Sequence, residues 1–237
     1  MNDEAARLSR RTALALLLTA TVASVTPTKS AAAGAEPQPQ ASRAIIVTGA
    51  EPERYVLYNS SLNAFNDMDR ARRPEFDNAM KGQNLQLGHD FQTAIAEQLT
   101  RMGYPARMQD IPHRDADEFL EPSEVATVDS DIVVDIVFEH VQYANTPFSR
   151  GLKPGVWFGV RAIDVRTQRY IFREKFTYDG HYSPLVSVNV EPDPKYDFKS
   201  EADLYANPAL AAEGLRAAAP LIAEKAVALL VAKLKER

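Results

Sequence analysis

The chain has 237 residues, of which 45% are apolar and 25% charged, and its formal net charge is −5. The apolar fraction excludes a disordered chain, and the acidic balance argues against nucleic acid or an anionic membrane as the main partner, because such surfaces bind positive charge. The chain has no cysteine, which excludes disulfides, thiol catalysis, thiolate metal sites and the lipid-bearing cysteine of a bacterial lipoprotein.

Residues 1–35 have the three parts of a secretory signal. Arg10 and Arg11 lie in a positive head, residues 13–25 form an apolar stretch, and residues 30–35 offer small side chains for cleavage. The stretch is too short for a membrane-spanning helix, which needs about 20 apolar residues. An amphipathic helix of the domain is the less favoured interpretation, because the stretch lacks a polar face. We therefore predict export to the periplasm or the medium, and no transmembrane segment in the mature chain.

The triplet Ser9-Arg10-Arg11 resembles the start of a twin-arginine signal, which implies export of an already folded protein. The Phe-Leu-Lys part of that signal is not matched, since Ala-Leu-Ala stands at residues 13–15. Adjacent arginines also occur in ordinary Sec signals, so both routes stay open. Residues 1–35 hold four of the 27 basic and two of the 32 acidic residues. The remaining chain therefore carries 23 basic and 30 acidic groups, a net charge of −7.

After the signal, the sequence predicts a Pro/Gln-rich linker over residues 36–43 and a single α+β domain over residues 44–237. The runs "RAIIVTGA" and "YVLYN" predict two short strands. Residues 60–83 are polar and contain Pro74 and Gly82, and they predict a loop with at most one helical turn. A helix is predicted over residues 87–104, because apolar residues recur every three or four positions and Gly103 is placed to end it.

The middle of the domain predicts three long strands. Residues 109–129 are acidic and irregular, and residues 131–143 then form an almost wholly apolar, β-branched run typical of a central strand. The runs "GVWFGVRAIDV" and "RYIFREKFTY" alternate in polarity around "RTQ" and predict an antiparallel hairpin. Asp135 and Glu139 fall on the less apolar face of the central strand. We interpret that face as partly solvated, or as paired with Arg161 or Arg173 across the sheet.

The C-terminal part predicts a long loop and a helical segment. Residues 183–207 contain three prolines and predict a loop that is either functional or mobile. A helix should begin at Asn207 as N-cap with Pro208 in its first turn, and Pro220 should kink or split it. The order of elements predicts an α+β fold with a mixed, mostly antiparallel sheet and two helices packed on one face.

This pattern resembles small α/β domains of bacterial envelope proteins, such as the N-terminal domain of TolB and CsgG-like lipoprotein domains. The resemblance depends on "FQTAIAEQLTRMGYPARM" and on "AIDVRTQRYIF", in which Asp164, Thr167 and Phe172 fit a hairpin pattern and Gln168 replaces its glycine. It covers roughly residues 44–178 and the last helix. It implies a role in envelope assembly or transport and carries over no catalytic residue.

The sequence offers few groups for chemistry. None of its histidines is paired at metal-ligand spacing; they are His89, His113, His140 and His181. The cluster of His113, Asp115 and Asp117 suggests a metal site, but an exposed acidic loop is the favoured interpretation. No nucleophile elbow, phosphate loop or dinucleotide fingerprint is present. We therefore expect no cofactor, no metal and no catalytic residues.

Three aromatic residues are candidates for an interaction surface: Trp157, Tyr182 and Tyr196. Trp157 alternates onto the strand face opposite Val156 and Phe158, where it is either a binding anchor or covered by another segment. The two tyrosines lie in the Pro-marked loop. The sequence favours a non-catalytic exported protein that acts through protein or ligand contacts in envelope assembly or transport. The alternative is a periplasmic hydrolase built on His113 or His181 with a nearby carboxylate.

Overall fold

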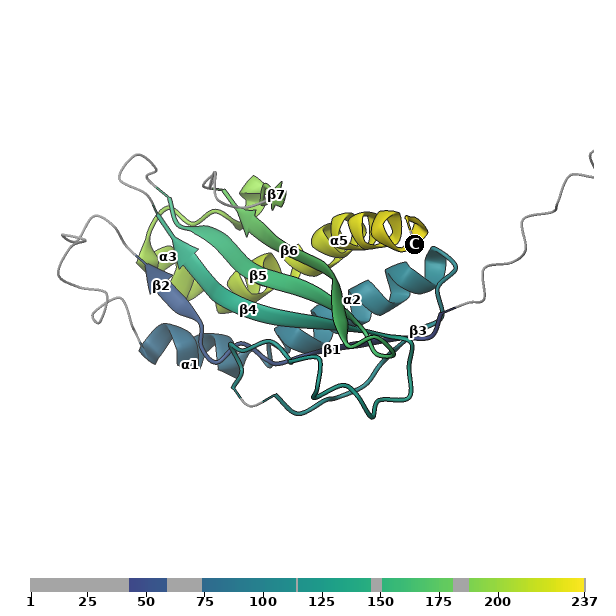
Figure 1. Ribbon diagram of the computed structural model, residues 1–237. Coiled ribbons are helices and arrows are strands. Elements are labelled where there is room, and N and C mark those ends of the chain that lie inside the picture. Colours follow the sequence, from purple (N-terminus) through teal and green to yellow (C-terminus); the bar gives the residue numbers. More distant parts are fainter. Residues whose placement is uncertain (1–42, 59–73, 114, 146–150, 181–187, 237) are drawn as a thin grey trace, which may run out of the picture. The chain divides into compact units, whose positions relative to one another are not determined.

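A mixed β-sheet organises the described part of the chain (Figure 1). The computed structural model describes residues 43–58, 74–113, 115–145, 151–180 and 188–236. The predicted signal peptide and nearly all of the predicted linker lie outside the described residues, as do His181 and Tyr182.

The strands run in the order β3-β1-β4-β5-β6-β7, and β2 also pairs with β4. The two long ladders, β4 with β5 and β5 with β6, are antiparallel, while the short pairings of β1, β2, β3 and β7 are parallel. The predicted α+β class is therefore confirmed. The strands are β1 (Ile45–Gly49), β2 (Val56–Tyr58), β3 (Ala106–Met108), β4 (Ile132–Ala144), β5 (Lys153–Asp164), β6 (Arg169–Asp179) and β7 (Val188–Val190).

Strand β4 is the centre of the sheet, as its β-branched sequence predicts. Both β1 and β2 pair with β4, β1 along its first part and β2 along its last three residues. A β-bulge between Phe138 and His140 inserts Glu139 and shifts the register against β5. Beyond the bulge the alternation is displaced, so Val141 joins the same core as Phe138. A strict period of two predicts Val141 on the opposite face, with Asp135 and Glu139; this is wrong because the period does not allow for the extra residue.

Helices cover one face of the sheet, with α2, α4 and α5 behind the long strands in Figure 1. Helix α2 packs against α5 and β1, and α5 packs against β6. The apolar stripes of α2 and α5 meet the inward side chains of β4 to β6 in one large core. Gly103 adopts a φ of +87° just beyond the end of α2, as its predicted capping role requires. The helices are α1 (Pro74–Gly82), α2 (Leu87–Arg101), α3 (Glu201–Ala206), α4 (Pro208–Arg216) and α5 (Ala218–Lys235).

Two predicted loops contain regular structure. Helix α1 occupies the region where at most one turn was expected, because Pro74 begins the helix, where its missing N–H is not needed. Phe76 and Met80, one turn apart, then bury their side chains in the core. The region 183–207 likewise contains β7, a short 3₁₀ turn (Pro194–Tyr196) and α3. The predicted split of the last helix is confirmed, since α4 ends at Arg216 and α5 begins at Ala218, with Pro220 in its first turn.

Part of the second face of the sheet is covered by a segment without helix or strand, residues 109–113 and 115–131, which we call the strap. It connects β3 to β4 and runs below the strands in Figure 1. Three of its apolar side chains are buried against Ile46, Val133 and Ile163 in a small second core; they are Ile111, Leu120 and Val125. The sequence predicted the irregular backbone of this segment correctly but gave no sign that it is packed on the sheet.

Candidate functional site

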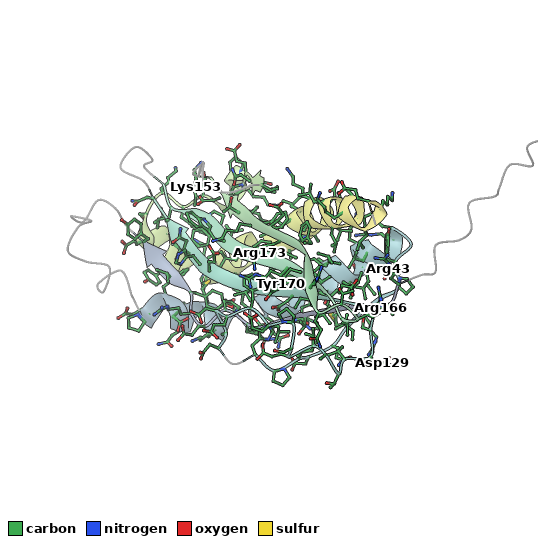
Figure 2. All side chains as sticks on the ribbon, viewed as in Figure 1. Arg43, Asp129, Lys153, Arg166, Tyr170 and Arg173 are labelled. Atoms are coloured by element: carbon green, nitrogen blue, oxygen red, sulfur yellow. The ribbon has the colours of Figure 1, made fainter. Side chains whose placement is uncertain are left out.

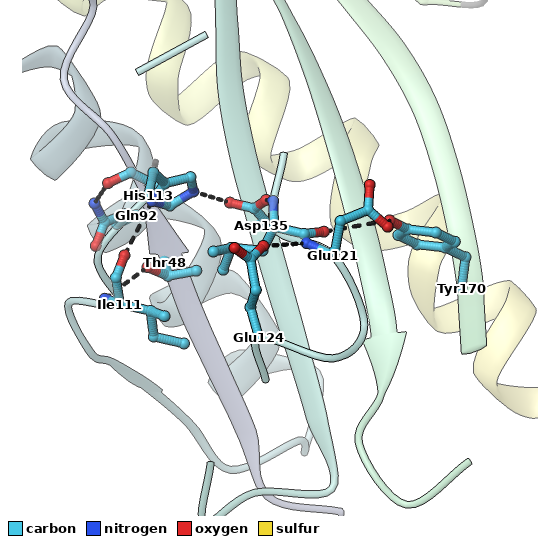
Figure 3. Close-up of polar contacts among 10 residues, drawn as sticks. Thr48, Gln92, Ile111, His113, Glu121, Glu124, Asp135 and Tyr170 are labelled. Atoms are coloured by element: carbon cyan, nitrogen blue, oxygen red, sulfur yellow. Dashed lines mark hydrogen bonds and ion pairs between the residues drawn. The ribbon is translucent and has the colours of Figure 1, made fainter. Parts of the chain in front are cut away.

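The strap is held to the sheet by a buried histidine–aspartate pair (Figure 3). His113 Nε2 lies 2.7 Å from Asp135 Oδ1, and the two side chains are 6% and 0% exposed. The other carboxylate oxygen of Asp135 accepts a hydrogen bond from the backbone N–H of Leu120 at 2.8 Å. On the far side of the ring, His113 Nδ1 lies 3.0 Å from the carbonyl oxygen of Ile111. Every polar atom of this pair therefore contacts a group of the strap or the sheet.

This arrangement corrects two interpretations. His113 is not part of an exposed loop, because its side chain is buried, and its partner is Asp135 rather than Asp115 or Asp117. Asp135 lies opposite Arg161 in the β4–β5 ladder, yet it is not solvated and its hydrogen bonds go to His113 and Leu120. The sequence showed the polar side chain in an apolar strand, but the strap that satisfies it is distant in sequence.

An aromatic contact fastens the strap further along the same face. The Phe119 ring lies so close to Gly159 of β5 that a Cβ at that position would be 2.5 Å from Phe119 Cζ. The Arg161 guanidinium lies over the Phe119 ring, 3.8 Å from its centroid, which is a cation–π contact. The Tyr170 hydroxyl lies 3.3 Å from the carbonyl oxygen of Leu120. Figure 2 labels Tyr170 and Arg173 on β6, which forms part of this face.

Beyond the strap, the face carries an exposed polar and aromatic surface that we call the open half-face, comprising Glu139, His140, Trp157 and Lys175. His140 and Trp157 are cross-strand partners, and their ring centroids are 5.8 Å apart. His140 is exposed and Trp157 is half-buried. Trp157 Nε1–H donates to Asp179 Oδ2 at 2.8 Å, which fixes the orientation of the indole ring. Glu139 pairs with Lys175 rather than with either of the predicted arginines.

A cavity of about 190 Å³ lies where the strap meets the open half-face. Its wall includes Asp117 of the strap, Glu139 and His140 of β4, and Glu53 and Arg54 from the connection between β1 and β2. Asp117 is therefore the member of the predicted polar cluster that lines this cavity. The bulge in β4 places Glu139 and His140 here, and no signal in the sequence assigned a role to His140.

The remaining predicted site residues that the structure describes, Tyr196 and Asp115, do not form part of the open half-face. Tyr196 is 4% exposed, and its hydroxyl donates to Glu213 Oε1 of α4 at 2.9 Å. Its ring is therefore packed against a helix and is not displayed. Asp115 is exposed on the strap, and Tyr182 lies outside the described residues. Of the two aromatic candidates that the structure describes, Trp157 is the accessible one.

Two further kinds of site are absent from the described residues. No group of three or more His, Cys, Asp or Glu side chains is placed to hold a metal ion within these residues. None of the described helices is long and apolar enough to cross a membrane.

Comparisons with known proteins gave structural neighbours but no sequence relatives. No family model matches the chain, and no curated protein matches it. A DUF330-family protein from Xanthomonas campestris is similar with 9% identity and a TM-score of 0.45, over 85% of this chain and 91% of that one. The PelC dodecamer subunit from Paraburkholderia phytofirmans has 13% identity and a TM-score of 0.29, over 60% and 76% of the two chains.

Lipoprotein GNA1162 from Neisseria meningitidis is also similar, with 12% identity and a TM-score of 0.31, over 60% of this chain and 88% of that one. These neighbours are bacterial proteins, and one of them is a lipoprotein. TM-scores below 0.5 leave the similarities too weak to carry a functional argument. The resemblance to TolB and CsgG-like domains therefore stays a prediction from the sequence.

Proposed function

We propose that this chain is an exported, non-catalytic protein that acts in the bacterial periplasm by binding a protein partner through the open half-face. The observation that carries the proposal is the Trp157 ring, which is half-buried beside the exposed His140 and oriented by its hydrogen bond to Asp179. An aromatic ring that is already held in place loses little conformational entropy on binding, and tryptophan is enriched among the residues that dominate binding energies.

The buried pair favours binding over the hydrolase alternative. A general base must reach a substrate proton through a free ring nitrogen. Both ring nitrogens of His113 face protein oxygen atoms, and the side chains of the pair are almost entirely buried. The pair therefore suits a structural role. Export is supported by the N-terminal residues 1–35, whose basic head, apolar stretch and small residues fit a signal peptide.

A single preparation tests export and binding. The full chain is expressed with its own N-terminus, recovered from the periplasm and analysed by mass spectrometry, and partners are captured by cross-linking in the periplasmic extract. We expect an N-terminus created by cleavage within residues 30–35. Trp157→Ala should capture at least about 10-fold less of the partner than the wild type, as the loss of a dominant contact requires.

A matched control uses Leu221 of α5, which is 43% exposed on the helical layer. Leu221→Ala should capture the partner as the wild type does. Equal capture by Trp157→Ala and the wild type would contradict the assigned surface. An intact Met1 in cytosolic protein would contradict export.

A further inference from the structure

The hydrogen bonds of His113 require more protons than a neutral imidazole can supply. Nδ1 faces the Ile111 carbonyl oxygen at 3.0 Å, and Nε2 faces Asp135 Oδ1 at 2.7 Å (Figure 3). A carbonyl oxygen and a carboxylate oxygen only accept, while a neutral imidazole has one donor and one acceptor nitrogen. Both contacts are hydrogen bonds only when the pair holds one further proton, on the imidazole or shared with the carboxylate.

The same pair fixes the position of the strap. Asp135 Oδ2 accepts the N–H of Leu120, and Leu120 is one of the three strap residues buried in the second core. The Ile111 N–H donates to Thr48 Oγ1 of β1 at 3.2 Å. The strap is thus anchored on both sides of His113. If the extra proton leaves, the one remaining ring proton can serve only one of the two contacts. With that proton on Nε2, the Nδ1 lone pair faces the Ile111 carbonyl oxygen at 3.0 Å, and with it on Nδ1, the Nε2 lone pair faces Asp135 Oδ1 at 2.7 Å. In either case one of the contacts that hold His113 in place becomes repulsive in a largely buried site.

The geometry points to a proton-operated latch: the His113–Asp135 pair holds the strap against the sheet while it keeps its extra proton, and loss of that proton frees the strap. Release would expose the apolar side chains beneath the strap, Ile46, Val133 and Ile163. This device is independent of the partner proposed above. It suits an exported protein, because no cytoplasmic buffer would then set the pH around it.

The charges around the pair determine the direction of the pH response. The hydrogen bond that His113 donates to Asp135 on β4 raises the pKa of His113 above its usual value, and the charge of Glu124 on the strap adds to this, while burial acts in the opposite direction. On β5, Arg161 lies opposite Asp135, with its guanidinium over the Phe119 ring. Because the folded pKa is raised, the stabilisation is complete below the unfolded value of about 6.5 and is lost as pH rises through the folded pKa.

Hydrogen exchange of the full-length protein tests the latch, because the Leu120 amide hydrogen is bonded to the latch itself. The exchange rate, divided by the intrinsic rate at each pH, gives the equilibrium constant for opening of the strap. For the wild type we expect this constant to be flat below about pH 6.5, which is the ordinary pKa of histidine in the open state, and to rise by up to about 10-fold per pH unit between that value and the raised pKa of the closed pair, where opening releases one proton. Above the pKa of the closed pair the constant should level off, because both states are then deprotonated. His113→Gln offers an amide donor that does not titrate, so its opening constant should stay within about twofold across the range.

The matched control is His89→Gln, which removes an exposed histidine on α2 and should keep the wild-type pH profile. A pH-dependent rise in His113→Gln equal to that of the wild type would overturn the proposal, as would a flat profile in the wild type. Nuclear magnetic resonance on the wild type gives a readout without a variant. At pH 6, an ionised Asp135 carboxylate beside a His113 ring that lacks its Nε2 proton would also overturn it.

Discussion

The two faces of the sheet are covered in different ways. On one face, helices α2, α4 and α5 bury a large and almost entirely apolar core. On the other, the strap buries a small core, and polar groups such as Asp135 and Thr48 accept hydrogen bonds from its backbone. A helix satisfies its own backbone groups, whereas an irregular segment must find partners outside itself. Polar side chains of the sheet therefore bind the strap backbone at two of its buried residues, Ile111 and Leu120.

This difference implies that the strap opens more easily than the helical layer unfolds. Stability against opening depends on buried apolar contacts and protected backbone hydrogen bonds, and both are fewer beneath the strap. Substitutions in the helical layer should weaken the whole fold. Substitutions beneath the strap should act on strap opening first and on global unfolding less.

The largest effect is expected in the helical layer. Leu230 of α5 is 2% exposed in the large core, so Leu230→Asp buries a charge without a partner and should lower the free energy of unfolding by roughly 3–5 kcal/mol. Urea unfolding followed by circular dichroism measures the change. The neighbouring Leu229 is 40% exposed, and Leu229→Asp should stay within about 0.5 kcal/mol of the wild type. Equal stability of the two variants would show that α5 is not docked as described.

An intermediate effect is expected at the aromatic contact of the strap. Gly159→Ala places a Cβ against the Phe119 ring, and the displaced ring should destabilise the strap by about 1–3 kcal/mol. The opening constant from the Leu120 amide measures it. In a Phe119→Ala background the added methyl group meets no ring, so Gly159→Ala should then have an effect below about 0.5 kcal/mol. Effects that simply add in the double variant would contradict the contact.

The smallest effect is expected at Tyr170. Tyr170→Phe keeps the ring that lies near Arg173 and removes the hydroxyl that contacts Leu120 and Glu121. A single hydrogen bond at a partly exposed site contributes about 0.5–1 kcal/mol, and the loss should appear in the Leu120 opening constant. Tyr104→Phe, which changes a tyrosine packed on the helical side, should leave that constant unchanged. A larger change in Tyr104→Phe than in Tyr170→Phe would reverse the assignment.

The sequence predicted the helical face well because its signals are local. The stripe of α2, the alternation of β5 and β6, and the proline positions of α4 and α5 each lie within one element. The strap face was predicted poorly because its contacts are long-range. Asp135 and His113 are 22 residues apart, and no periodicity connects them.

The candidate surface was predicted only in part. Trp157 was found by its alternation within β5, which places it opposite Phe158. Its neighbour His140 was missed because the bulge at Glu139 changes which side of β4 each residue faces, and a bulge has no reliable signature in a single sequence. Tyr196 was a candidate because its loop contains prolines, but its burial depends on contact with Glu213 of α4.

Helix α5 has a consequence for when folding can finish. It comes after all the other described elements in the chain, and the large core stays open to water until α5 has packed against α2 and β6. The β4–β5–β6 meander pairs strands that are neighbours in sequence, so it can form during translation. The core can close only after α5 has been synthesised. A transport route that accepts only finished folds would therefore have to wait until translation has passed Lys235.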